Sequence, residues 1–128
     1  MTYDYVCVLD FEATCDDTQK YFMHEIIEFP SVLYHWNDDV KNYQKVSEIQ
    51  IYCKPLKNIE LTPFCTKLTG ITQDKVDNGV NFPDALRKHH SWLAENIGYD
   101  MSSCIIMTCG MWDLNTVMPE ECKRWRLV

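Results

Sequence analysis

The sequence lacks the features that place a protein in a membrane or along a nucleic acid by charge alone. Its longest apolar runs fall well below the roughly 20 residues of a membrane-spanning helix, and no basic segment precedes an apolar one at the amino terminus. We therefore expect neither a bilayer span nor a signal peptide. Only 12 Lys and Arg stand against 19 Asp and Glu, a net charge of −7, which argues against a broad basic face for long nucleic acids. It is compatible with a protein that contacts a few nucleotides, where a bound metal supplies positive charge.

No Cys-x-x-C pair occurs, and the seven cysteines are odd in number. The sequence therefore signals neither a zinc site nor a disulfide framework. Reduced thiols are expected, as in the cytoplasm or the nucleus. We accordingly expect an intracellular protein, cytoplasmic or nuclear, with no membrane partner.

No linker, repeat or low-complexity tract divides the chain. With 128 residues, of which 46% are hydrophobic and 24% charged, the composition is that of an ordinary soluble protein. The sequence predicts a single domain, residues 1–128, with one rather small core.

The stretch Tyr3–Cys15 predicts the centre of the fold. The run Tyr5–Leu9 is apolar at every position, including those that would face opposite sides of a strand, and two acids, Asp10 and Glu12, follow it. Such a run is typical of a strand covered on both faces. Side chains two apart on a strand share a face, roughly 6.5–7 Å apart. Two carboxylates there would suit a hard divalent cation. The alternative is a pair of acids at a frayed strand end, facing water.

Further strands are predicted at Glu25–Trp36, Val46–Cys53 and Ser103–Thr108. Pro30 cannot donate a ladder hydrogen bond and is expected at a strand start or a bulge. Turn residues at Asn37–Asp39 favour a hairpin between the first two of these strands. Short links between the first three strands of the chain predict an antiparallel meander.

Helices are predicted between these strands and after them. Thr62 and Pro63 are typical of a helix start and Gly70 of its end, while Thr72 favours a short turn over Gln73–Val76. The longest helix is predicted over 82–97, followed by Gly98. Its apolar side is expected to be formed by Phe82, Leu86, His90, Leu93 and Ile97.

The last part of the chain predicts a turn at Gly110–Asp113 and a brief helix that Pro119 closes. Cys122–Val128 fits a strand or a frayed helix. Together these elements predict an α/β fold of the ribonuclease H-like arrangement, with a mixed central sheet flanked by helices.

Five segments resemble the DEDDh class of 3′–5′ exonucleases, and within it the Eri exoribonucleases. They follow in that family's order and cover most of the chain. Each motif is common by itself, but the five together are specific. The segments are DFEATC (Asp10–Cys15), HEIIEFP (His24–Pro30), LTGIT (Leu68–Thr72), FPDAL (Phe82–Leu86) and G-x-W-D (Gly110–Asp113).

The resemblance implies hydrolysis of the terminal phosphodiester of RNA, releasing nucleoside 5′-monophosphates. It assigns Asp10, Glu12 and Asp113 as catalytic residues and as ligands of Mg²⁺ or Mn²⁺. Two metals about 3.5–4 Å apart would clamp the attacking water and the leaving oxygen. Asp113 has an alternative role as a helix N-cap, a position that favours Asp.

The resemblance also implies contacts with the 3′ end of the substrate. The backbone around Ala13 approaches the terminal sugar, the segment from Leu68 packs near the last base, and Trp112 is placed to stack a base. The alternatives are a helix end with core contacts and a Trp packed on the sheet. The implied substrate-binding residues are Ala13, Thr14, Leu68, Thr69, Ile71 and Trp112.

The sequence departs from the family after Asp113. The family has a histidine, the general base, and a fourth acid on a late helix, whereas no His or Asp follows Asp113 here. Glu120 and Glu121 are the later acids, and a helix first turn would favour them anyway. His90 and Glu95 have the family spacing on a different helix. We therefore expect a C-terminally shortened domain with impaired activity, holding one metal where the family holds two.

Three hypotheses follow for function. The first is a 3′–5′ exoribonuclease acting on single-stranded RNA 3′ ends, or on DNA. The second is a catalytically degenerate fold that binds RNA ends or regulates a partner. The third is an interaction module whose acids are only surface groups. Because a shortened domain would expose an apolar face, we expect Cys122–Val128 to cover part of it, or a homodimer or a pairing with a full-length relative there.

Overall fold

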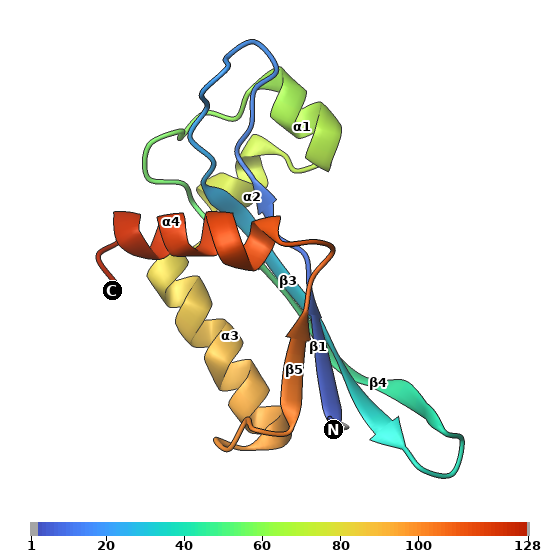
Figure 1. Cartoon of the computed structure of the whole chain (residues 1–128). Helices are drawn as coiled ribbons and strands as arrows, with labels where there is room; N and C mark the ends of the chain where they lie inside the picture. Colours follow the sequence, from blue (N-terminus) through green and yellow to red (C-terminus); the bar gives the residue numbers. More distant parts are fainter. Residues whose placement is uncertain (1–2, 128) are drawn as a thin grey trace.

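A computed structural model describes residues 3–127 of the chain, which form a five-stranded mixed sheet with helices (Figure 1). None of the helices in this range is long and apolar enough to cross a bilayer. The strands are β1 (Tyr5–Leu9), β2 (Glu12–Ala13), β3 (Ile26–Asn37), β4 (Asn42–Tyr52) and β5 (Cys104–Met107).

Strand β1 lies inside the sheet, as predicted. It pairs antiparallel with β3 on one side and parallel with β5 on the other. Strand β4 pairs antiparallel with β3, so the predicted meander is confirmed. The parallel strand β5 follows the longest helix, as the crossover arrangement requires.

The predicted continuous strand through the two acids is wrong, because it is interrupted at Asp10 and Phe11. Strand β1 ends with Leu9 opposite Ser31 of β3, and β2 resumes with Glu12 opposite Glu28. The acids therefore do not follow the face alternation of one strand.

Pro30 is in the interior of β3, paired with Gln50 of β4, and not at a strand start or bulge. The register puts it between Ser31, which pairs with β1, and Glu28, which pairs with β2. Proline is tolerated there because the neighbouring ladder is broken at this point. The interruption that accommodates the proline is the same one that carries Asp10.

Capping residues explain where the helices begin and end. Thr62 accepts a hydrogen bond from Cys65 N at the start of α1, and Gly70 ends that helix with φ 75°. Asn81 caps α3 in the same way, whereas Thr72 precedes α2 without a side-chain bond. The helical segments are α1 (Pro63–Thr69), α2 (Gln73–Asp77), α3 (Phe82–Ile97), the π-helical η1 (Asp113–Val117) and α4 (Met118–Arg124).

The predicted apolar side of α3 is wrong at one position, since His89 is buried and His90 is exposed. The Nε2 atom of His89 lies 2.7 Å from Ser31 Oγ, and burial lowers the pKa of His89 to about 4. The apolar side is rotated because Trp92 enters the core and its Nε1 donates to Ser47 Oγ at 2.9 Å. The buried residues of α3 are Phe82, Ala85, His89, Trp92 and Leu93.

The C-terminal segment is helical as far as Arg124, and residues 125–127 form a turn and an irregular end. Segment η1 continues directly into α4, and Pro119 stands in the first turn of α4 rather than closing a helix. Cys122 and Trp125 pack against the main core, so this segment covers part of the apolar core, which is one of the two predicted alternatives. Val128 lies outside the described residues. The core thus joins this segment to β1, β3 and α3.

Both α3 and α4 pack on one side of the sheet (Figure 1). On the other side, side chains of β1 and of the edge strand β5 are exposed. The prediction that β1 is covered on both faces is therefore wrong, because Val8 is 37% exposed and its neighbour Met107 is 52% exposed.

Candidate active site

A small pocket lies where the break between β1 and β2 meets the end of α1 and the start of η1. Its volume is about 190 Å³, less than the 300 Å³ or more typical of drug-sized sites, so it suits part of a nucleotide. The lining residues are Phe11, Glu12, Ala13, Cys15, His24, Leu68, Thr69 and Trp112.

Asp113 is fixed beside the two N-terminal acids by one long-range hydrogen bond. Its Oδ2 atom accepts from the buried backbone N–H of Phe11 at 2.8 Å, and Phe11 lies between Asp10 and Glu12 in the chain. Asp113 is 4% exposed. The alternative role as an N-cap is not realised, because Trp112 occupies that position and makes no capping bond.

Glu12 lies in an uncompensated negative field. Burial raises its pKa above the ordinary value, and the charges of Asp10, Glu28 and Asp113 raise it further. Glu28 was not among the predicted site residues, although it faces Glu12 across β2 and β3. The signal that could have found it is an acid inside the apolar segment HEIIEFP.

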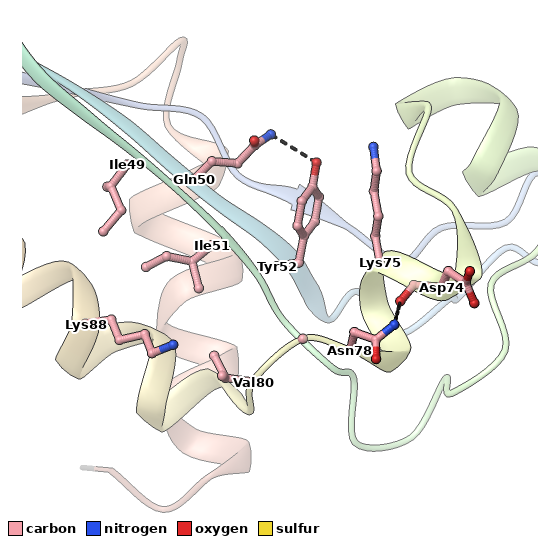
Figure 2. A pocket seen from close by; sticks show the side chains of 10 residues that line it. Ile49, Gln50, Ile51, Tyr52, Asp74, Lys75, Asn78, Val80 and Lys88 are labelled. Carbon is pink, nitrogen blue, oxygen red and sulfur yellow. Dashed lines mark hydrogen bonds between the residues drawn. The ribbon is translucent and has the colours of Figure 1, made fainter.

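Hydrogen bonds from β4 hold Glu28 in this position. Gln50 Nε2 donates to Glu28 Oε2 at 2.7 Å and to the Tyr52 hydroxyl at 3.0 Å. Figure 2 shows Gln50 and Tyr52 at the edge of a second hollow of about 600 Å³ beside α2, near Lys75. None of the predicted site residues lines this second hollow.

The donor set suits a hard divalent cation, because carboxylate oxygens are the ligands that Mg²⁺ prefers. A cation would relieve the repulsion that, after burial, raises the pKa of Glu12. Across residues 3–127, however, no three Asp, Glu, His or Cys side chains lie close enough together to hold a metal ion. The acidic residues therefore lie near one another, but they do not form a complete set of metal ligands.

Comparison with known families decides the class of this site. Residues 7–127 match the family described as Exonuclease. The chain belongs to the exonuclease family. It is 40% identical over 127 residues to 3'-5' exoribonuclease 1 of Mus musculus, covering 98% of this chain and 35% of that protein. It is 38% identical over 122 residues to ERI1 exoribonuclease 3 of Homo sapiens, covering 94% of this chain and 35% of that protein.

Solved exonuclease structures superpose on nearly the whole chain. A full-length 3'-exonuclease matches with a TM-score of 0.87 and 37% identity over 98% of this chain and 55% of its own. The nuclease domain of 3'hExo, a DEDDh family member bound to rAMP, matches with a TM-score of 0.85 and 38% identity over 97% of this chain and 60% of its own. The predicted ribonuclease H-like fold and the resemblance to Eri exoribonucleases are confirmed. The chain spans about a third of the length of these curated relatives.

Two of the six implied substrate-binding residues do not line the pocket. The Thr14 side chain is used internally, since its hydroxyl donates to Met23 O and accepts from Glu25 N. Ile71 is buried in a separate cluster with Cys65. Ala13, Leu68, Thr69 and Trp112 do line it together with Glu12, whereas Asp10 and Asp113 lie beside it.

The acids and histidine considered as substitutes for the missing family groups are used elsewhere. Glu121 is 1% exposed and forms an ion pair with Arg124. Glu120 is exposed in the first turn of α4, where acids were expected. His90 and Glu95 are exposed on α3. None of these groups lines the pocket.

Three pocket residues were not among the predicted site residues, Phe11, Cys15 and His24; of these, only His24 carries a polar ring. Its Nδ1 atom lies 2.8 Å from Thr14 O. Its ring meets the Trp112 ring edge to face, with centroids 5.8 Å apart. The signal that could have found it is its place at the start of HEIIEFP, where a polar ring precedes a buried strand.

Proposed function

We propose that this chain is a divalent-metal-dependent 3′–5′ exonuclease that acts on RNA 3′ ends and releases nucleoside 5′-monophosphates. The observation that carries the proposal is the hydrogen bond from Phe11 N to Asp113. It brings together acids from the two ends of the chain, beside a pocket that suits part of a nucleotide. Membership of the exonuclease family supports the same chemistry.

Asp10, Glu12 and Asp113 are the proposed ligands of Mg²⁺ or Mn²⁺. When bound, such a cation supplies charge stabilisation for the reacting phosphate and a nucleophilic water at neutral pH. The contribution of this chain is to hold the three carboxylates in a partly dry site. Burial and their mutual repulsion both raise the pKa of Glu12, and both favour a cation beside these carboxylates.

The proposed substrate is the terminal nucleotide of a single strand, with RNA preferred to DNA. Ala13, Leu68 and Thr69 form walls of the pocket, and Trp112 offers an aromatic face, 39% exposed, to a base. Aromatic stacking of a base contributes about 1–3 kcal/mol. A related 3'-exonuclease is described as recognising the 3′ end of the histone mRNA stem-loop, which supports RNA here.

We propose that turnover by this 128-residue chain is slow. A general base typically contributes about 10²–10⁴-fold in rate, and neither the pocket nor the residues after Asp113 provide the family histidine or fourth acid. The same observation favours the second candidate function, a protein that binds RNA ends without cutting them.

A nuclease assay separates these two functions. RNA labelled in its 3′-terminal nucleotide is incubated with the chain and Mg²⁺ or Mn²⁺, beside the variants Asp10→Ala and Asp39→Ala. Asp39 is exposed in the β3–β4 turn and serves as the matched control. Release of labelled mononucleotide by the unsubstituted chain and by Asp39→Ala, but not by Asp10→Ala, supports the nuclease. Metal-dependent RNA binding without product supports the binding protein, and a product that survives Asp10→Ala refutes both.

The exposed side of the sheet supports a polypeptide partner, either a second copy of this chain or a full-length relative. Val8, Ile105 and Met107 lie together on β1 and β5 and are 37%, 37% and 52% exposed. Contiguous apolar surface of this kind marks association sites. The molar mass from light scattering should be that of a dimer for the unsubstituted chain and that of a monomer for Ile105→Lys. A monomeric mass for the unsubstituted chain would exclude the homodimer.

A further inference from the structure

His24 is held by three contacts of its ring and one of its backbone. Its Nδ1 atom lies 2.8 Å from Thr14 O, and its backbone oxygen accepts from Arg124 Nη2 at 3.4 Å. Its ring meets Trp112 at 81° and Phe22 at 64°, with centroid distances of 5.8 and 6.1 Å. Such a ring is preorganised, so little conformational entropy is lost when it binds a ligand.

The bond to Thr14 decides which ring nitrogen is available. A carbonyl oxygen can only accept, so Nδ1 must carry the proton. In the neutral ring Nε2 is then an acceptor, and within residues 3–127 it has no hydrogen-bond partner. Because His24 lines the pocket, this acceptor is available to a bound group that donates a hydrogen bond.

The donor must be present on every nucleotide that an exonuclease removes in succession. Base amino groups do not meet this condition, because uracil has none, whereas each terminal ribose carries a 2′ and a 3′ hydroxyl. Glu12, His24 and Thr69 are pocket side chains that can accept from them, but the Thr69 hydroxyl already donates to Cys65 O and accepts from Ile71 N. Glu12 is one of the neighbouring acids proposed to bind the metal. We therefore assign His24 as the acceptor for a ribose hydroxyl.

We propose that His24 Nε2 accepts a hydrogen bond from the 2′-hydroxyl of the terminal ribose, which makes His24 the residue that distinguishes RNA from DNA at this site. The inference rests on the proposed nuclease function, since it takes the same pocket as the nucleotide site. The 2′-hydroxyl is the group that differs between RNA and DNA, so a nucleotide without it leaves the His24 acceptor without this hydrogen bond.

A binding cycle tests the assignment without relying on turnover. Titration calorimetry with Mg²⁺ compares 5′-AMP, 2′-deoxy-AMP and 3′-deoxy-AMP on the unsubstituted chain, on His24→Asn and on the control His90→Asn. Asparagine retains an amide N–H for Thr14 O and loses the distal acceptor. His90 is an exposed neighbour of the buried His89 on α3 and does not line the pocket.

The expected result is a loss of about three- to tenfold in affinity for 5′-AMP with His24→Asn and no change for 2′-deoxy-AMP. His24→Gln, whose amide oxygen reaches the place of Nε2, should recover part of the preference. Equal losses for the two nucleotides, or a preference that follows the 3′-hydroxyl, would overturn the assignment while leaving the nuclease proposal intact. An unsubstituted chain that binds none of the three nucleotides would overturn both.

Discussion

The bond between Asp113 and Phe11 N provides the sharpest test of the site, because it separates the structural role of the carboxylate from its charge. Asp113→Ala leaves a buried N–H without an acceptor, since Asp113 is 4% exposed and its Oδ2 lies 2.8 Å from Phe11 N. An unsatisfied buried donor costs about 1–3 kcal/mol. We expect the free energy of unfolding to fall by that amount.

Asp113→Asn should behave differently, because the amide oxygen can still accept from Phe11 N while the negative charge is lost. Removing that charge also relieves Glu12, whose pKa is raised partly by Asp113. We therefore expect Asn to be close to neutral for stability without metal, and to abolish the stabilisation by Mn²⁺ that we expect for the unsubstituted chain.

Urea unfolding, with and without Mn²⁺, measures both effects, with Asp39→Ala as the exposed control. An Asn variant as unstable as the Ala variant would mean that the charge, and not the acceptor, holds Asp113 in place. An Asn variant stabilised by Mn²⁺ as much as the unsubstituted chain would mean that Asp113 is not a metal ligand.

Three further predictions concern the metal, the pH dependence and the packing. Mg²⁺ or Mn²⁺ should raise the melting temperature, with about 2.7 kcal/mol of stabilisation at a hundredfold excess over Kd; a flat scan across divalent cations favours an interaction module. Burial lowers the pKa of His89 from 6.5 to about 4, so the unfolded chain binds more protons in that window. Stability should therefore be lost on acidification from pH 6.5 to 4, at up to about 1.4 kcal/mol per pH unit, and His89→Phe should flatten this slope in urea titrations. Gly79→Ala places a Cβ 2.7 Å from the backbone oxygen of Tyr52, the same oxygen that accepts from Val80 N, and so breaks the parallel bridge between Val80 and Cys53, the residue after β4. It should cost about 1–3 kcal/mol, and thermal unfolding as stable as that of Lys54→Ala would contradict this packing.

Local sequence patterns predicted the ends of α1 and α3 well, because their causes are local, whereas Pro119 was wrongly predicted to close a helix. Thr62, Pro63 and Gly70 delimit α1 by hydrogen bonds and backbone angles within one turn. The side of α3 that is buried was predicted wrongly at His90, because the choice depends on partners distant in the chain. Ser31 and Ser47 on the sheet accept or share hydrogen bonds with His89 and Trp92, and only the fold brings them together.

The candidate site divides in the same way. The motif DFEATC predicted that Asp10 and Glu12 carry chemistry, but it implied a continuous strand. The break at Asp10–Phe11 depends on β3, where Pro30 stands opposite the gap, and this cannot be read from β1 alone. Glu28 and His24 belong to a quoted motif, yet their roles appear only once β3 lies against β2.

The sequence by itself determined the family, the order of strands and helices, and the residue types that suit a divalent metal, because these follow from composition, short spacings and matching motifs. Only the tertiary structure decided which acids meet, which histidine enters the pocket and which face of the sheet stays open. These depend on contacts such as Phe11 with Asp113, 102 residues apart. No local pattern encodes such a contact, because it forms only when the packed core joins the two ends of the chain.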